Sequence, residues 1–167
     1  MFRPTRDPSE VPPGASSVLM PIVLTRSGLS ILFTRRTKNM SAFAGHLSFP
    51  GGRIDPTDET PLAAALRETE EEIGLTSKEV VVLGHFTELH THFGTLVICF
   101  AGALHQHHVP TRASSPREVE EILQVPIESF LRPGQVQPTG DARHYVASSY
   151  ESRRIGVPHA PSRTLHY

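Results

Sequence analysis

The sequence predicts a single α/β domain in which β-strands precede and follow one acidic helix. Three observations support this fold class. The chain has 167 residues, which is enough for one domain with a core of ordinary size. Apolar runs of strand length recur between residues 17 and 104 and are bounded by Gly, Ser and Pro. Residues 61–73 instead place apolar side chains at the helical period.

The expected elements are strands, then the helix, then further strands. Residues 1–14, rich in Pro, Arg and acidic residues, should form an extended lead-in. A strand is expected over residues 17–25, where Pro21 favours a position near a sheet edge or a bulge. Residues 29–35 should be its hairpin partner. After the helix we expect a short buried strand at 80–83, a longer strand at 95–104, a strand or turn at 118–125 and a short helix at 127–131.

The helix has recognisable start and stop signals. Thr60 is a suitable N-cap, and Pro61 suits the first helical position. Gly74 stands where a left-handed C-terminal cap is expected. The side that faces the core should consist of Leu62, Ala65, Leu66, Thr69 and Ile73.

Three glutamates of this helix should share one face. Glu68, Glu71 and Glu72 stand at positions i, i+3 and i+4, whereas Glu70 points away and should be solvated. Like charges this close repel one another. A hard cation such as Mg²⁺ or Mn²⁺ prefers oxygen ligands and would neutralise the cluster. The pattern therefore indicates a metal site.

A glycine turn precedes the helix. Phe49 ends an apolar stretch, and Pro50, Gly51 and Gly52 then form a turn that needs unusual backbone angles. Paired glycines also let a backbone carbonyl approach a ligand without interference from a Cβ atom. We therefore expect a loop–helix–loop motif that presents three carboxylates beside a glycine turn.

This segment resembles the Nudix box, a family pattern written G-x5-E-x7-R-E-U-x-E-E-x-G-U, in which U is apolar. The chain departs from the pattern at two positions. Asp58 stands in the place of the first glutamate, and eight residues rather than seven separate it from Arg67. Thr69 replaces an apolar residue. The residues that fit are Arg67, Glu68, Glu71, Glu72, Gly74 and Leu75.

The Asp58 variant and the residues before the box resemble the coenzyme A pyrophosphatase subgroup of this family. Phe43 occupies a position that usually holds His, and His46 one that usually holds Gln. Residues 115–127 resemble the E-V-x-E and V-P-L segments of the subgroup. The signature residues that fit are Thr34, Arg36 (or Arg35, in a register shifted by one), Gly45, Ser48 and the F-P-G-G of residues 49–52.

The resemblance divides the chain into a lead-in, a Nudix hydrolase domain over residues 15–131 and a divergent tail. The tail, residues 132–167, has no W-G-x-T-A segment of the kind the subgroup carries, and should pack on the domain or extend it. The fold that the resemblance implies is an α/β/α sandwich with a mixed β-sheet.

The resemblance also implies the chemistry, which is metal-dependent hydrolysis of a diphosphate linked to a nucleoside. Glu71 and Glu72 are the expected metal ligands, and Glu68 is a ligand or the base that orients water. Gly51 would contribute its carbonyl to the metal. Arg67 would hold the carboxylates in place through charge-assisted hydrogen bonds.

One more carboxylate from outside the box is expected to complete the site. Glu118 and Glu121 are the first candidates, followed by Glu88. The basic residues nearest the signature would meet the substrate's phosphates, because guanidinium groups match phosphate oxygens. These expected substrate-binding residues are Arg35, Arg36, Lys38 and His46.

Three functions remain open, of which coenzyme A hydrolysis is the leading one. The substrate would be coenzyme A or acyl-CoA, and the products a phosphopantetheine moiety and adenosine 3′,5′-bisphosphate. A second function keeps the chemistry but acts on ADP-ribose, dinucleotides or nucleoside triphosphates, and Phe43 in place of the signature His keeps it open. A third is a non-catalytic nucleotide-binding module, against which the intact glutamate cluster argues.

Composition excludes several partners. The formal net charge of −1 gives no general attraction to nucleic acid or to an anionic membrane. No run approaches the roughly 20 apolar residues of a membrane span, and residues 1–8 lack the apolar core of a secretion signal. A cytoplasmic protein is expected, and the oligomeric state stays open with a homodimer among the alternatives. The single cysteine, Cys99, should be a small buried hydrophobe in a strand.

Ten histidines raise the alternative of a zinc site. His90 and His92 would share a face of a strand, while His105, His107 and His108 lie together in the chain. None has the accompanying cysteines or the helical spacing of a zinc motif. Loop histidines without a ligand role are therefore favoured, although His85 and His90 could instead contact substrate.

Overall fold

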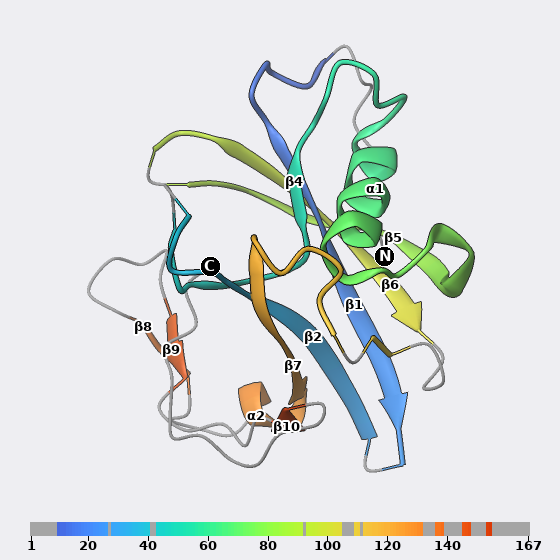
Figure 1. The fold of residues 1–167 in the computed structure, drawn as a ribbon, viewed down its shortest axis with the longest axis vertical. Coiled ribbons are helices and arrows are strands. Elements are labelled where there is room, and N and C mark those ends of the chain that lie inside the picture. The colour runs from blue at the N-terminus through green and yellow to red at the C-terminus, as the bar shows by residue number, and fades with distance from the viewer. Residues whose placement is uncertain are drawn as a thin grey trace.

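The computed structural model describes residues 10–26, 28–40, 43–91, 93–104, 109–110, 112–131, 136–138, 145–147 and 153–154 (Figure 1). The elements are β1 (Ser16–Thr25), β2 (Gly28–Arg36), β3 (Leu47–Ser48), β4 (Gly51–Arg53), α1 (Pro61–Ile73), the 3-10 turn η2 (Ser77–Glu79), β5 (Val80–His90), β6 (Leu96–Leu104), β7 (Val119–Pro126), α2 (Glu128–Leu131), β8 (Val136–Pro138), β9 (Tyr145–Ala147) and β10 (Arg153–Arg154).

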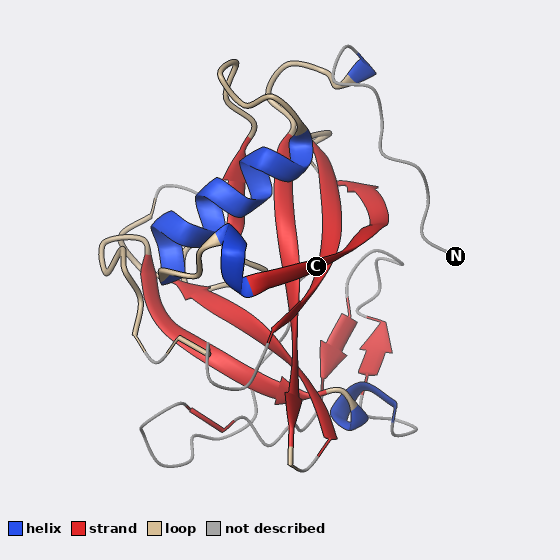
Figure 2. Ribbon diagram, turned by 90° about the vertical axis from the view of Figure 1, so that its right-hand side faces the viewer, coloured by secondary structure: helices blue, strands red, loops and turns tan. Residues whose placement is uncertain are grey.

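A mixed β-sheet forms the centre of the fold. Its strand order is β10-β7-β2-β1-β6-β5, with β3 paired to β2 and β4 paired to β1. β1 and β6 run parallel, whereas β1–β2, β2–β7 and β5–β6 are antiparallel. Figure 2 shows α1 lying across one face of this sheet. The expected α/β sandwich with a mixed sheet is confirmed.

Apolar side chains cover both faces of the sheet. On the α1 face, Leu19, Leu32 and Phe100 are fully buried with Ala65 and Ile73 of the helix. On the opposite face, strand residues pack with Phe49 of the glycine turn and Phe130 of α2; they are Phe33, Leu47, Leu123 and Val125, beside a cluster of Met20, Cys99 and Ala101. The sheet therefore has helical residues on each side, and Cys99 is the small buried hydrophobe that was expected.

The acidic helix has the predicted bounds. The Thr60 hydroxyl accepts a hydrogen bond from the Ala63 N–H at 3.0 Å. At the other end Gly74 adopts a φ of 73°, and its N–H donates to the Glu70 carbonyl at 2.8 Å. Thr69, the departure from the apolar pattern, is fully buried because its hydroxyl donates to the Ala65 carbonyl at 2.6 Å. A threonine can therefore replace an apolar residue here without an unpaired polar atom.

Two details of the strands differ from expectation. Pro21 lies in β1, which is a central strand and not an edge. On one side of β1, the pairing with β4 ends at Val18 and the pairing with β2 begins at Ile22, so Pro21 falls in the gap between these two partners. On the other side, Pro21 pairs in parallel register with Gly102 of β6. β5 is an edge strand of 11 residues and not a short buried one. Bulges interrupt its pairing with β6, and Val81, Val82 and Leu83 are exposed on this strand, which pairs with β6 alone among the described strands.

The ends of the chain fall largely outside the described residues. Of the expected lead-in, residues 1–9 lie outside them, and of the expected tail only the short strands β8, β9 and β10 are described. In the part of the chain that the structure describes, no helix has the length and apolar character needed to cross a membrane.

Candidate active site

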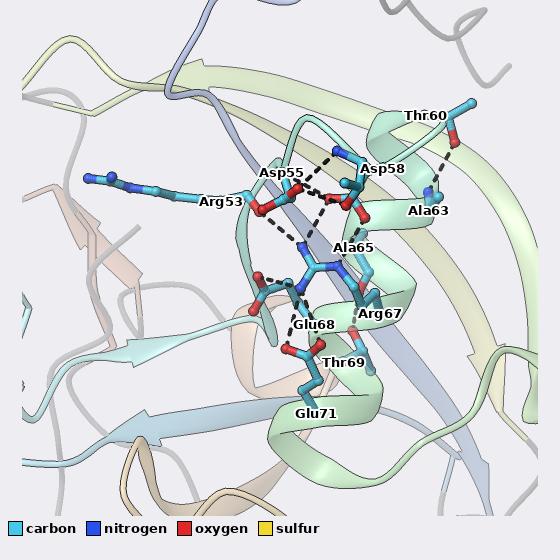
Figure 3. Close-up of polar contacts among 11 residues, drawn as sticks. Arg53, Asp55, Asp58, Thr60, Ala63, Ala65, Arg67, Glu68, Thr69 and Glu71 are labelled. Carbon is cyan, nitrogen blue, oxygen red and sulfur yellow. Dashed lines mark hydrogen bonds and ion pairs between the residues drawn. The ribbon is translucent and has the colours of Figure 1, made fainter.

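Arg67 lies at the centre of the acidic motif (Figure 3). Its Nε and Nη2 donate to the two carboxylate oxygens of Asp58 at 2.9 and 3.0 Å. Its Nη1 donates to Glu68 at 3.0 Å and to Glu71 at 3.3 Å, and Nη2 also reaches the Arg53 carbonyl at 3.3 Å. Arg67 was expected to hold the carboxylates in place, and its contacts join the loop before the helix to two glutamates of the box. We call Arg67, Asp58, Glu68 and Glu71 the Arg67 cluster.

Asp58 acts as the acidic partner of Arg67 in this loop. Glu59 has the spacing of the family pattern, with seven residues between it and Arg67, but Glu59 is exposed whereas the Asp58 side chain is only 6% exposed. The hydrogen bond from Arg67 lowers the pKa of the Asp58 carboxyl below its ordinary value of 3.8. One extra loop residue thus leaves the arginine–carboxylate pair intact.

The glycine turn approaches both Glu68 and Glu72. The Gly51 N–H donates to the Glu72 carboxylate at 3.2 Å. Gly51 has a φ of 147°, and a Cβ atom there would overlap the Ser17 backbone, so glycine is required. A Cβ atom on Gly52 would overlap the Glu68 carboxylate. Two of the three predicted ligands therefore lie against the turn whose carbonyl was expected to assist them.

Glu72 is the most deeply buried carboxylate of the motif, with 3% of its surface exposed. Burial raises the pKa of its carboxyl to about 7, although the Gly51 N–H and the charge of Arg36 oppose the rise and Glu68 and Glu118 add to it. Burial likewise raises the pKa of Glu68, while Arg67 opposes that rise. The Glu71 side chain, by contrast with the buried Glu72, is 59% exposed.

Glu118 is brought toward the box by the segment before β7. The N–H groups of Ser114 and Ser115 donate to the Glu72 carbonyl at 2.9 and 3.2 Å, which attaches this segment to the end of α1. The charge of Glu118 contributes to the raised pKa of both Glu68 and Glu72. Of the three candidate carboxylates outside the box, Glu118 is therefore the one whose charge acts on Glu68 and Glu72.

The other two carboxylates have different partners. Glu121 forms an ion pair with Arg35. Glu88 lies 3.5 Å from Nε2 of His85 on β5, and the His85 ring packs against Phe100 with centroids 5.8 Å apart. His90 is exposed, whereas His92, His105, His107 and His108 lie outside the described residues.

The four predicted substrate-binding residues do not share one environment. Arg36 lies close enough to Glu72 to act on its pKa, and its Nε is buried without a hydrogen-bond partner among the described residues. Lys38 is exposed on the loop between β2 and β3, and His46 lies at the end of that loop. Arg35 is buried within the fold and is bound by Glu121 and by the Gly45 carbonyl.

Arg53 is a candidate substrate-binding residue that the sequence patterns did not identify. It directly follows Gly52, and its side chain is exposed and extends away from the Arg67 cluster (Figure 3). Its position immediately after paired glycines was the available signal, since those glycines already pointed to a ligand-binding turn.

The oxygen atoms of these carboxylates are suitable ligands for a hard cation. Within the described residues, no three His, Cys, Asp or Glu side chains are already grouped as a metal site. Glu68 and Glu71 are directed at Arg67, and Glu72 at the Gly51 N–H. All these donors are oxygen atoms, which Mg²⁺ and Mn²⁺ prefer. A buried carboxylate whose pKa is raised would also be stabilised by a neighbouring cation.

Sequence comparisons place the motif in a family. A model of the NUDIX domain matches residues 16–146. The chain is 39% identical over 133 residues to a probable nudix hydrolase of Schizosaccharomyces pombe, covering 79% of this chain and 45% of that protein. It is 33% identical over 138 residues to the mouse peroxisomal coenzyme A diphosphatase NUDT7, covering 81% and 58%. The chain thus spans about half the length of these two curated relatives.

A bacterial relative and solved structures agree with this family match. The chain is 34% identical over 141 residues to an uncharacterised Nudix hydrolase, NudL, of Escherichia coli, covering 81% of this chain and 72% of that protein. A Caenorhabditis elegans Ap4A hydrolase in a binary complex shares the fold with a TM-score of 0.56 at 20% identity, covering 68% and 80% of the two chains. A MutT protein from Methanosarcina mazei does so with a TM-score of 0.54 at 25% identity, covering 73% and 83%.

Enzymes of this family use divalent metal ions, in agreement with the oxygen-rich motif on α1. The family match spans most of the chain, and the relatives are named as hydrolases of the same family. This chain belongs to the Nudix hydrolase family.

Proposed function

We propose that this chain hydrolyses the diphosphate linkage of coenzyme A or acyl-CoA in a reaction that depends on Mg²⁺ or Mn²⁺. The products would be a phosphopantetheine moiety and adenosine 3′,5′-bisphosphate. The observation that carries the proposal is the approach of Glu68 and Glu72 to the Gly51-Gly52 turn. Coenzyme A as substrate is supported by the signature residues before the box and by the likeness to the mouse diphosphatase.

The cation would be held by Glu68, Glu71, Glu72 and the Gly51 carbonyl, with Glu118 as the ligand from outside the box. A bound divalent ion would neutralise phosphate charge and lower the pKa of the attacking water. The all-oxygen donor set fits this role. Glu68 has an alternative role as the base that orients water, because burial raises the pKa of its carboxyl and so makes it a stronger proton acceptor.

The remaining residues would position the substrate, since phosphoryl transfer depends mainly on positioning and charge stabilisation. Arg36 stands beside Glu72, so its guanidinium is suited to a phosphate oxygen near the metal ligands. Arg53, Lys38 and His46 supply further donors around the same turn and loop. Arg67 would keep Glu68 and Glu71 in place through the contacts it already makes.

A second candidate function is hydrolysis of ADP-ribose, dinucleotides or nucleoside triphosphates. The observation that favours it is Phe43, which replaces the signature His, is 39% exposed and contacts the exposed Phe93 with ring centroids 5.9 Å apart. Exposed aromatic rings can stack on any nucleobase. A non-catalytic nucleotide-binding module is the third candidate.

The test is a product assay by mass spectrometry with Mg²⁺ and then with Mn²⁺. Coenzyme A, ADP-ribose, NADH and a nucleoside triphosphate would be offered in parallel. Release of adenosine 3′,5′-bisphosphate from coenzyme A, faster than cleavage of the others, is expected. Preferred turnover of ADP-ribose or NADH would reject coenzyme A and keep the chemistry, whereas nucleotide binding without turnover would favour the binding module.

Two neighbouring glutamates provide an inactive variant for this assay and its matched control. Glu71→Gln should lower metal-dependent turnover by about 10³-fold, because it removes a metal ligand. Glu70→Gln should have little effect, because Glu70 is exposed on another side of the helix. Equal losses in the two variants would contradict the assignment of the ligand face.

A further inference from the structure

Two adjacent arginines at the end of β2 face opposite sides of the sheet. Arg36 is on the α1 side, where its charge acts on Glu72. Arg35 pairs in register with Glu121 of β7. Because side chains alternate along a strand, Arg35 is on the same side as Phe33, which packs with Leu123 on the face opposite α1. The two cations therefore cannot have the same role.

Arg35 is committed to contacts inside the fold. The residue is 8% exposed, its Nε donates to Oε1 of Glu121 as an ion pair, and its Nη1 donates to the Gly45 carbonyl at 3.2 Å. A buried arginine needs both charge compensation and hydrogen-bond acceptors. Glu121 supplies the charge, whereas Gly45 supplies an acceptor that belongs to a different segment.

Gly45 belongs to the loop between β2 and β3, of which the structure describes residues 37–40 and 43–46. The base of this loop is closed by the Arg36 N–H donating to the His46 carbonyl at 3.0 Å and the Gly45 N–H donating to the Arg36 carbonyl at 3.1 Å. On its other side, the Thr37 N–H donates to the Glu118 carbonyl at 2.8 Å. The loop therefore adjoins both Arg36 and the segment that carries Glu118.

The loop also holds an unfavourable backbone conformation. Phe43 has a φ of 53°, which is rare for a bulky side chain. Such a conformation persists only when surrounding contacts enforce it. The Arg35 hydrogen bond to Gly45, two residues further along, is a side-chain contact that can do so.

We propose that Arg35 is a positioning residue, which holds residues 43–46 of the β2–β3 loop beside the active site through Glu121 and the Gly45 carbonyl and does not itself touch substrate. The proposal rests on the proposed function only in its effect on substrate binding. Loss of the anchor lowers the fraction of molecules with a binding-competent loop, so apparent affinity falls by the same factor. The carboxylates on the other face are untouched, so kcat is retained.

A set of variants separates this role from simple stabilisation. Arg35→Met removes the Arg35 ion-pair partner of the Glu121 carboxylate and should lower the melting temperature. The double variant Arg35→Met, Glu121→Leu removes both charges and should recover most of the stability, because an apolar pair can replace a buried ion pair. It still has no donor for the Gly45 carbonyl. Arg26→Met, at an exposed arginine after β1, is the matched control.

The double variant should raise KM for the preferred substrate by roughly tenfold, while kcat stays within about twofold of the parent. A KM that returns to the parent value together with stability would overturn the proposal, because the pair would then serve stability alone. A loss confined to kcat would overturn it as well.

A second readout does not depend on turnover. The chain contains no tryptophan, so Phe43→Trp introduces a single indole into the loop as a fluorescent reporter. In that background, Arg35→Met with Glu121→Leu should increase acrylamide quenching and lower the fluorescence anisotropy, and Arg26→Met should change neither. Unchanged quenching and anisotropy would overturn the proposal. If no substrate is turned over, the proposed function fails, but this measurement still decides whether Arg35 holds the loop.

Discussion

The two ends of the acidic motif differ in how their negative charge is balanced. In the Arg67 cluster, one guanidinium donates to Asp58, Glu68 and Glu71. Next to Glu71 in the chain, Glu72 is almost fully buried, accepts the Gly51 N–H, and has a pKa raised by its burial to about 7. The chain itself balances the charges of the first region, whereas in the second the Gly51 N–H and the charge of Arg36 do not offset the cost of burying the Glu72 carboxylate.

This difference separates stability from function within 15 residues. Ionised groups with nearby opposite charges and hydrogen bonds stabilise a fold, while buried carboxylates without them oppose it. A protein retains the second kind where an external cation compensates the charge. We therefore expect changes at Asp58 to be measured mainly as stability, and changes at Glu72 mainly as metal binding and activity.

The largest expected effect is at Glu72, where Glu72→Gln should affect activity and metal-free stability in opposite directions. Activity should fall by about 10³-fold, because a metal ligand is lost. Without metal, the variant should be more stable than the parent above neutral pH, by up to about 3 kcal/mol, because the buried carboxylate no longer ionises.

The direction of the pH dependence follows from the raised pKa. In the folded state Glu72 ionises near pH 7, whereas in the unfolded state it ionises near its ordinary value of 4.5. The parent should therefore lose stability as pH rises from about 4.5 to about 7, and Glu72→Gln should lack this loss. Thermal melts with a chelator at several pH values measure it. Parallel curves for parent and variant would contradict the unbalanced state of Glu72.

A smaller effect is expected at Gly52, where the glycine turn meets the Arg67 cluster. Gly52→Ala should lower activity by roughly tenfold while the melting temperature stays close to the parent value. The new Cβ atom would overlap the Glu68 carboxylate, which lies at the end of a flexible side chain and can move aside. Glu68 would then be displaced from the turn.

Gly102→Ala is the contrasting control for this substitution. A Cβ atom on Gly102 would lie 2.6 Å from Val80 and 3.1 Å from Leu19 in the core, so that variant should lose stability with little change in activity per folded molecule. Full activity in Gly52→Ala would show that the position of Glu68 beside the turn is not needed for turnover.

Local patterns predicted the helix and the motif, whereas pairing between distant segments was harder to predict. Thr60 and Gly74 marked the ends of α1 correctly because capping depends on neighbouring residues. β5 proved longer and more exposed than expected because its bulged pairing with β6 is a long-range property. The ion pair of Arg35 with Glu121 depends on the register of β2 with β7, which no local pattern encodes.

The smallest expected effect, at Asp58, tests the satisfied end of the comparison. Asp58→Asn should lower the free energy of unfolding by about 1 kcal/mol, because Arg67 loses a charged partner that it contacts through two hydrogen bonds, while remaining partly exposed to solvent. The pKa of Asp58 is held below its ordinary 3.8, so this stabilisation is present above that pH and is lost as the pH falls through the folded-state pKa. Denaturant titrations at neutral and acidic pH should therefore show a difference in the free energy of unfolding that shrinks under acid.

Glu59→Gln is the matched control for Asp58→Asn, because Glu59 has the spacing of the family pattern but is exposed. A larger loss in Glu59→Gln than in Asp58→Asn would mean that the partner of Arg67 in solution follows the family spacing, and the balanced end of the motif would have to be assigned to Glu59.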